Sequence, residues 1–326
     1  MDPFTIIIIF MFISILISFA IGANDETFST VNGSKTLNMK EILIFATILA
    51  ILGAILLGGS VSKTVGNKLF GSGVSDISEN MVLTVLFSTS IWLIISSYLG
   101  APISTTHSTI GSIIGVGILI GGLNGVEWLK ILEMSFWWIL SPIIGFAVTY
   151  VVYKLIHKYI INRLNGFKDF ERTERIFSYI LLVTIGLTAF SRAGNDCSNA
   201  VGIVIGLEAD ISIDLILIIT GISFSLGIIV LGRTVIKSVG NITELVPSSA
   251  FASQVPTAGI LFVGTILGVP LSGSHMLVAS LVGLSKSRKA PRKGGLKKII
   301  LIWFLTFPIA ALLAIVLYFP ISAIPF

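Results

Sequence analysis

Charged residues are scarce in this sequence. Asp, Glu, Lys and Arg together make up 11% of its 326 residues, whereas hydrophobic residues make up 54%. The mean hydropathy is correspondingly high, at +1.01. A chain with so little polar surface cannot cover a water-soluble globule, so the composition excludes a soluble protein and indicates one that lies in a lipid bilayer.

Cysteine and histidine are also rare. Cys197 is the only cysteine, which excludes an intramolecular disulfide and a cysteine-rich metal site. No nucleic-acid-binding motif accompanies the net charge of +5, so we expect no nucleic acid partner. We also expect no organic cofactor.

Long apolar runs are abundant. Each is close to the ~20 residues that a helix needs to cross a ~30 Å hydrocarbon core. The runs lack the strict alternation of lipid-facing strands, so we expect an all-α, multi-pass protein of the cell membrane, surrounded by lipid. The first run has no Lys or Arg ahead of it, and we expect it to be kept as a helix rather than cleaved as a signal. The runs are Phe4 to Ala20, Ile42 to Leu57, Met81 to Leu99, Phe136 to Ile156, Ile213 to Leu231 and Ile299 to Tyr318.

Basic residues gather in two loops. The first, from Lys154 to Arg175, carries six basic residues against three acidic ones, and the second, from Lys286 to Lys298, carries seven basic residues and no acidic one. Because loops rich in Lys and Arg stay on the cytoplasmic side, we expect both loops to be cytoplasmic. The second would form a basic collar facing lipid head groups.

Three blocks of the sequence occur twice, in the same order and at nearly constant separation. Internal similarity of this kind indicates that the chain is a duplication. The blocks are Gly22 to Asp25 with Ala193 to Asp196, Gly58 to Asn67 with Gly232 to Asn241, and Gly100 to His107 with Gly268 to His275.

The loops that follow equivalent blocks differ in charge. The stretch from Gly121 to Ser135 has one Lys and two Glu, whereas its counterpart is the loop with seven basic residues. Equivalent loops on opposite sides of the membrane predict two inverted-topology repeats, with broken or re-entrant helices around a site at the midplane. We expect a first repeat at 1–156, a cytoplasmic basic linker at 157–175 and a second repeat at 176–326, with both termini outside.

Two Asn-Asp pairs lie beside glycines in otherwise apolar sequence: Asn24-Asp25 and Asn195-Asp196. A charge inside a membrane costs at least ~2.5 to 3.5 kcal/mol unless it is compensated, so a repeated pair indicates a function. Each pair ends an apolar run, where freed carbonyls, an amide and a carboxylate would offer the oxygen ligands that Na⁺ requires. A proton bound to either Asp is the competing interpretation, and a helix-end cap in the head-group region is the purely structural one.

The sequence Pro-x-Ser-Thr-Thr-His and its later counterpart Pro-x-Ser-Gly-Ser-His favour helix starts. Pro in the first turn and Ser at the cap direct free N–H groups and hydroxyls outward, and two such termini would surround a tetrahedral oxyanion. An ordinary capped membrane helix is the alternative for either motif alone. We expect His107 and His275 to donate structural hydrogen bonds more readily than to bind the anion. The candidate anion-binding residues are Ser104, Thr105, Thr106, Ser272, Gly273 and Ser274.

Taken together, these doubled motifs resemble the inorganic phosphate transporter (PiT) family over nearly the whole chain. The resemblance implies a secondary active transporter, with symport of inorganic phosphate and Na⁺ or H⁺, inverted repeats and a homodimer. It assigns phosphate to the candidate anion-binding residues above, and the cation to Asn24, Asp25, Asn195 and Asp196, with Asn199 as a further amide. A sulfate permease of the same family is the alternative, and a membrane-embedded phosphatase is a more distant one.

The chain departs from the family pattern at several of these positions. The family continues its first motif as Asn-Asp-x-x-Asn-Ala, which the second copy keeps through Asn199 but the first replaces with Glu26 and the residues after it. Arg192 stands where the family usually has His, and Gly273-Ser274 stands in place of two Thr. Glu26 and Arg192 are therefore candidate accessory residues, as are both histidines. Two Asp and a phosphate carry three or four negative charges against about one positive charge from two helix ends, so cations would have to enter with the anion.

Overall fold

The protein is helical throughout the part of the chain that is described. The computed structural model describes residues 3–65, 69–205, 213–266, 271–290 and 296–325. Within these ranges the only β-type pairing is an isolated bridge between Phe70 and Val126. The α-helices are α1 (Pro3–Ala23), α2 (Ser29–Gly33), α3 (Met39–Val65), α4 (Glu79–Tyr98), α5 (Thr105–Gly121), α6 (Trp128–Tyr159), α7 (Phe167–Ile205), α8 (Ile213–Gly227), α9 (Arg233–Gly240), α10 (Pro247–Ile266), α11 (Gly273–Arg288) and α12 (Leu296–Ser322). Three short elements join them: η1 (Gly122–Gly125), η2 (Ile161–Arg163) and η3 (Ile228–Gly232), the last of which is π-helical.

Among the described residues, eight helical stretches are long and apolar enough to cross a membrane. Each of the six runs predicted from the sequence overlaps one of these stretches, and two more, Thr105–Gly125 and Phe167–Cys197, join the set. Large apolar side chains also cover the outside: Phe12 is 64% exposed, Leu129 77% and Phe304 78%. An apolar exterior of this extent is what a hydrocarbon environment requires, and it confirms the predicted all-α membrane fold.

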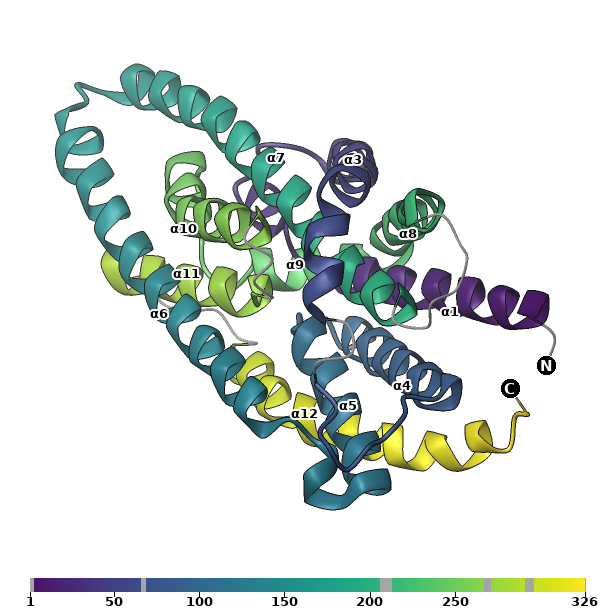
Figure 1. The fold of residues 1–326 in the computed structure, drawn as a ribbon. Helices are drawn as coiled ribbons and strands as arrows, with labels where there is room; N and C mark the ends of the chain where they lie inside the picture. The colour runs from purple at the N-terminus through teal and green to yellow at the C-terminus, as the bar shows by residue number, and fades with distance from the viewer. Residues whose placement is uncertain (1–2, 66–68, 206–212, 267–270, 291–295, 326) are drawn as a thin grey trace.

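The helices of the two halves pack against each other reciprocally. Helix α3 packs along α7, and the equivalent helices α8 and α1 pack in the same way. Helix α6 packs along α11, and α12 packs along α5 (Figure 1). Each half thus covers helices of the other rather than forming a separate body.

Two glycines show that this reciprocity extends to single residues. A Cβ at Gly53 in α3 would overlap the Phe190 carbonyl oxygen of α7, and a Cβ at Gly227 in α8 would overlap the Phe19 carbonyl oxygen of α1. Gly53 and Gly227 hold equivalent places in the two halves, as do Phe19 and Phe190. Only glycine permits backbones to approach this closely, and small residues at helix crossings are typical of membrane interiors.

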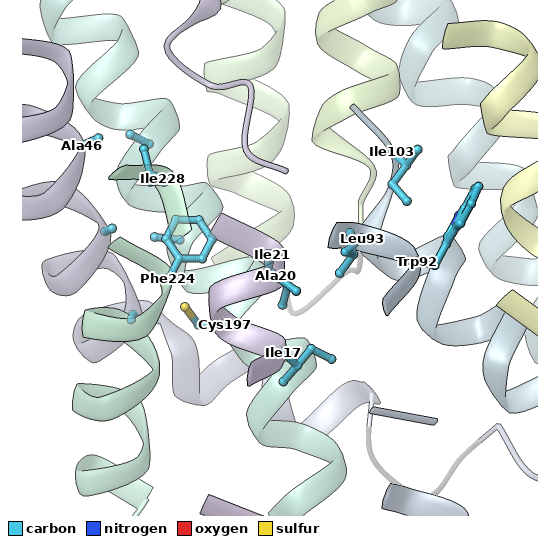
Figure 2. Packing of buried hydrophobic residues seen from close by; sticks show 14 of the residues in the cluster. Ile17, Ala20, Ile21, Ala46, Trp92, Leu93, Ile103, Cys197, Phe224 and Ile228 are labelled. Atoms are coloured by element: carbon cyan, nitrogen blue, oxygen red, sulfur yellow. The ribbon is translucent and has the colours of Figure 1, made fainter. Parts of the chain in front are cut away.

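The largest core cluster of the described residues draws on helices of both halves, including α1, α3, α4, α7, α8 and α12, and one part of it lies where α1, α7 and α8 meet. Figure 2 shows Ile21, Cys197 and Phe224 together in this region, and all three are buried. Cys197 is fully buried among apolar side chains, where a thiol acts as a small hydrophobic group. The same packing fixes the end of α1, after which the polar segment beginning at Asn24 follows.

The turn between α6 and α7 lies at the end of the molecule opposite both termini (Figure 1). Helix α6 runs on to Tyr159 and α7 begins at Phe167, so most of the stretch predicted as a linker, 157–175, is helical. Glu174 in α7 is buried, and its carboxylate accepts bonds from the Ser248 backbone N–H (2.8 Å) and hydroxyl (2.6 Å) at the start of α10. This carboxylate therefore caps α10 and ties it to α7.

Candidate functional site

Asn24, the first residue after α1, links α1 to the segment before α5. Its Nδ2 donates to the hydroxyls of Ser96 (3.1 Å) and Ser97 (3.0 Å) and to the Ala101 carbonyl (3.0 Å). Its Oδ1 accepts from the Ile103 N–H at 2.7 Å. The side chain therefore fixes the loop that leads into the first predicted anion motif.

Asp25 is held by its own loop and by the second half of the chain. Its Oδ1 accepts from the backbone N–H (3.0 Å) and hydroxyl (2.6 Å) of Thr27, and it lies 3.3 Å from Arg192 Nε. Asp25 is only 5% exposed. Hydrogen-bond donors and a positive charge therefore surround this buried carboxylate and offset the cost of burying it.

Arg192 in α7 lies at the centre of the polar site. Its guanidinium forms a bidentate ion pair with Glu26 and donates from Nε to Asp196 Oδ2 at 3.1 Å. Its Nη2 also donates to the Ser274 hydroxyl at 3.0 Å. One buried positive charge thus contacts three buried carboxylates, those of Asp25, Glu26 and Asp196.

Both predicted helix starts are present. Ser104 caps α5 and accepts from the His107 N–H at 3.3 Å, and Ser272 caps α11 and accepts from the His275 N–H at 3.4 Å. Because the amides of the first turn have no acceptor within their helix, each terminus directs N–H groups and positive partial charge away from its helix. Thr105 and Thr106, in the first turn of α5, are both buried.

The two helix starts meet inside the protein. The Ser274 hydroxyl in α11 donates to the Ile103 carbonyl before α5 at 3.1 Å, and the rings of His107 and His275 lie 4.5 Å apart. The motifs are far apart in the sequence, yet they form one junction between the halves. In this arrangement the Ser274 hydroxyl accepts from Arg192 and donates to Ile103, so both of its main hydrogen-bonding roles are used.

The two histidines lie in an aromatic enclosure. The His107 ring is 4.4 Å from that of Trp138 and 4.7 Å from that of Phe307, and the His275 ring is 4.1 Å from that of Trp303. The structural hydrogen bond predicted for each side chain is not seen at Nε2, since neither of these atoms has a hydrogen-bond partner within the described residues. Both rings fill space between the halves.

The second Asn-Asp pair differs from the prediction. We expected Asn195-Asp196 to end a helix and free its carbonyls, but α7 continues through the pair to Ile205. Gly194 explains the difference, because a Cβ there would lie 2.5 Å from the Leu57 Cβ and 3.0 Å from the Gly53 carbonyl oxygen. This glycine permits close packing of α7 against α3 rather than ending a helix. The side chain of Asn199 lies outside the described residues.

One polar residue at the site was missed by the sequence analysis. Gln254 in α10 is buried, and its Nε2 donates to the Thr27 carbonyl (3.2 Å) and the Thr30 hydroxyl (2.7 Å). It holds the loop that carries Asp25 and Glu26. A polar amide in an apolar helix is a signal of function, but Gln254 belongs to none of the repeated motifs from which the site was predicted.

The fold and the site define a class. Apolar helices surround a buried junction of two helix N-termini and several charged side chains, as in a membrane transport protein. The model of the phosphate transporter family matches residues 21–314, and the chain belongs to this family. Family and fold are those of a transporter rather than an enzyme.

The comparisons with individual proteins agree with this assignment. The chain is 28% identical over 398 residues to a predicted phosphate permease of Thermococcus kodakarensis, covering 98% of each chain. It is 25% identical over 404 residues to inorganic phosphate transporter 2-1, chloroplastic, of Arabidopsis thaliana, covering 91% of this chain and 69% of the relative. Among solved structures it is similar to "The sodium-dependent phosphate transporter", with a TM-score of 0.87 and 25% identity over 98% of this chain and 100% of the other.

Proposed function

We propose that the protein is a secondary active transporter that carries inorganic phosphate across the cell membrane together with Na⁺ or H⁺. The observation that carries the proposal is the junction of the α5 and α11 N-termini directly beside the cluster around Arg192. This junction offers donors to an anion, and the neighbouring carboxylates offer oxygen ligands to a cation. The similarity to the solved structure of a sodium-dependent phosphate transporter favours Na⁺ over H⁺.

The proposed site has two parts. The part that holds phosphate consists of the capping and first-turn residues of α5 and α11, and the part that holds the cation consists of the Asn-Asp pairs. The ligands proposed for phosphate are Ser104, Thr105, Thr106, Ser272, Gly273 and Ser274. The ligands proposed for the cation are Asn24, Asp25, Asn195, Asp196 and Asn199.

The charges of the site make coupling a physical necessity under this proposal. If Asp25, Glu26 and Asp196 are ionised, the three carboxylates and Arg192 sum to a charge of −2 in buried surroundings. A phosphate ion would bring one or two further negative charges into the same low-dielectric region. Uptake of a cation lowers that cost, so the anion and the cation enter together.

The architecture that we propose for this function is a pair of inverted repeats, 1–156 and 176–326, joined by a cytoplasmic segment at 157–175. The reciprocal packing of the two halves supports the duplication. The position of the α6–α7 turn, opposite both termini, supports a cytoplasmic turn with both termini outside (Figure 1). We further propose a homodimer, which cross-linking in native membranes would test.

Uptake of labelled phosphate into proteoliposomes tests the function. Na⁺ and pH gradients are imposed separately, with unlabelled sulfate as competitor and protein-free liposomes as control. We expect concentrative phosphate uptake that follows the Na⁺ gradient and is little affected by sulfate. Absence of phosphate uptake under either gradient contradicts the proposal, whereas uptake blocked by sulfate reassigns the substrate.

A further inference from the structure

Glu26 and Arg192 form an ion pair that joins the two halves of the chain. Both side chains are buried, and both carboxylate oxygens of Glu26 face the two terminal nitrogens of the guanidinium. A bidentate fork of this kind is the geometry that Arg offers to carboxylate and to phosphate alike. Glu26 therefore occupies the face of Arg192 that would otherwise suit a phosphate ion.

The same guanidinium lies against the start of α11. A Cβ added to Gly273 would be 3.4 Å from both Cζ and Nη1 of Arg192, so the glycine lets the guanidinium lie next to the first turn. The equivalent residue in α5 is Thr105, which has a side chain at the position where Gly273 has none. An anion bound at the amides of the α11 N-terminus would consequently be within reach of Arg192.

The described contacts leave Arg192 some capacity for a further acceptor. Its Nε and Nη2 donate to Asp196, Glu26 and Ser274, and Nη1 donates to Glu26. Four of the five N–H groups of a guanidinium are thus engaged within the described residues. The fifth, on Nη1, belongs to the nitrogen that lies closest to Gly273.

We propose that phosphate and Glu26 compete for Arg192: phosphate displaces the Glu26 carboxylate from the guanidinium, and the displaced carboxylate is neutralised by the coupling cation. This inference rests on the proposed function and assigns two residues to it. Glu26 acts as an internal substitute for the anion, and Arg192 binds phosphate during transport. No covalent bond changes in this exchange.

The exchange would couple the two ions through one side chain. A buried carboxylate that loses its partner is strongly disfavoured, so Glu26 leaves Arg192 only when a cation or proton replaces the lost positive charge. Asp25 and Asp196 face the same guanidinium and add to this requirement. With phosphate absent, the ion pair re-forms and holds the two halves together at the site.

Substituting Glu26→Gln tests the competition, because glutamine keeps the shape and removes the charge. In proteoliposomes we expect the apparent phosphate affinity of this variant to increase about tenfold, which corresponds to about 1.4 kcal/mol. We also expect its dependence on the coupling cation to weaken. Arg192→Lys keeps the charge but loses the fork, and we expect it to lower the phosphate affinity.

The matched control is Glu174→Gln, which removes another buried carboxylate whose side-chain hydrogen bonds, among the described residues, go to Ser248 at the start of α10. We expect this control to leave phosphate affinity and cation dependence unchanged. If Glu26→Gln fails to fold, Glu26→Asp is measured instead; its shorter reach weakens the fork, and the affinity should again increase.

The outcomes separate this inference from the proposed function. If the unsubstituted protein takes up no phosphate, the proposed function fails. If it transports phosphate but Glu26→Gln binds phosphate no more tightly than Glu174→Gln, or Glu26→Asp no more tightly than the unsubstituted protein, the ion pair is only structural and the inference is overturned.

Discussion

His107 and His275 lie ring against ring at the junction of α5 and α11, with 4.5 Å between their centroids. Each stands at the same place in its repeat, one turn into a helix that Ser104 or Ser272 caps. The contact therefore joins the two copies of one motif. The contact also predicts how substitutions of His107 will change the stability of the protein.

Replacing His107 with phenylalanine should preserve the packing, because the ring contacts are aromatic and Nε2 has no partner among the described residues. Replacing it with alanine should leave a cavity against Trp138 and Phe307 and cost about 3 kcal/mol of stability. Thermal unfolding in detergent measures the difference. Equal stability of the two variants would show that ring packing is not what His107 contributes.

Asp25→Asn and Asp196→Asn should each abolish concentrative phosphate uptake under the proposed function. Both carboxylates are buried and contact Arg192, and their amides would bind a cation far less strongly. Counterflow exchange of labelled phosphate distinguishes lost coupling from lost binding. Transport with unchanged cation dependence in both variants would exclude these residues from coupling.

The close helix crossings predict that a single methyl group added at a glycine there will lower the stability of the protein. Gly53→Ala and Gly227→Ala place a Cβ against a backbone carbonyl, and we expect each to lower the stability by about 1 to 3 kcal/mol. Gly259→Ala, in α10, is the control, because nothing lies within 4 Å of its added Cβ. In a helix interior this control should stabilise by about 0.5 to 1 kcal/mol. Detergent unfolding of all three variants provides the comparison.

The caps of α5 and α11 can be compared with a cap away from the site. Ser104→Ala, Ser272→Ala and Ser78→Ala each remove a hydroxyl that accepts a bond at a helix start, at a cost of about 1 kcal/mol. Only the first two should also raise the KM for phosphate, because Ser78 caps α4. A similar KM for phosphate in all three variants would show that Ser104 and Ser272 do not contribute to phosphate binding.

The proposed inverted topology predicts that equivalent loops are accessible from opposite sides of the membrane. Leu123 is 72% exposed in the loop after α5, and Lys289 is exposed in the loop after α11. Cysteines placed at these two positions should react with an impermeant thiol reagent from opposite sides of the membrane. Cys197 is fully buried, so the unsubstituted protein serves as the unlabelled control. Labelling of both positions from one side would contradict inverted repeats.

The apolar helices could be predicted from sequence because they depend on local composition. The Ser104 and Ser272 caps were predicted for the same reason, since a cap is a bond across three residues. The continuous helix through Asn195-Asp196 was not predicted. Glycine before a polar pair favours a helix end locally, and only the neighbouring α3 shows that close packing is what Gly194 provides.

The ion pair between Glu26 and Arg192 lay beyond prediction for a different reason. The two residues were recognised separately as departures from the family pattern, but they are 166 residues apart and neither is repeated. No spacing rule connects them, because their contact depends on how α1 and α7 come together in three dimensions. The same holds for Gln254, whose partners lie in the opposite half of the chain.

The reciprocal contacts of Gly53 with Phe190 and of Gly227 with Phe19 have a consequence for the origin of the chain. Helices of each half pack extensively against helices of the other, so a half-length ancestor with these surfaces could have covered them by associating with a second copy of itself. Fusion of two such genes would then have freed each copy to change alone. Glu26 and Arg192 fit such a history, because each occurs in one half only. A symmetric dimer of identical chains could not have had their ion pair just once.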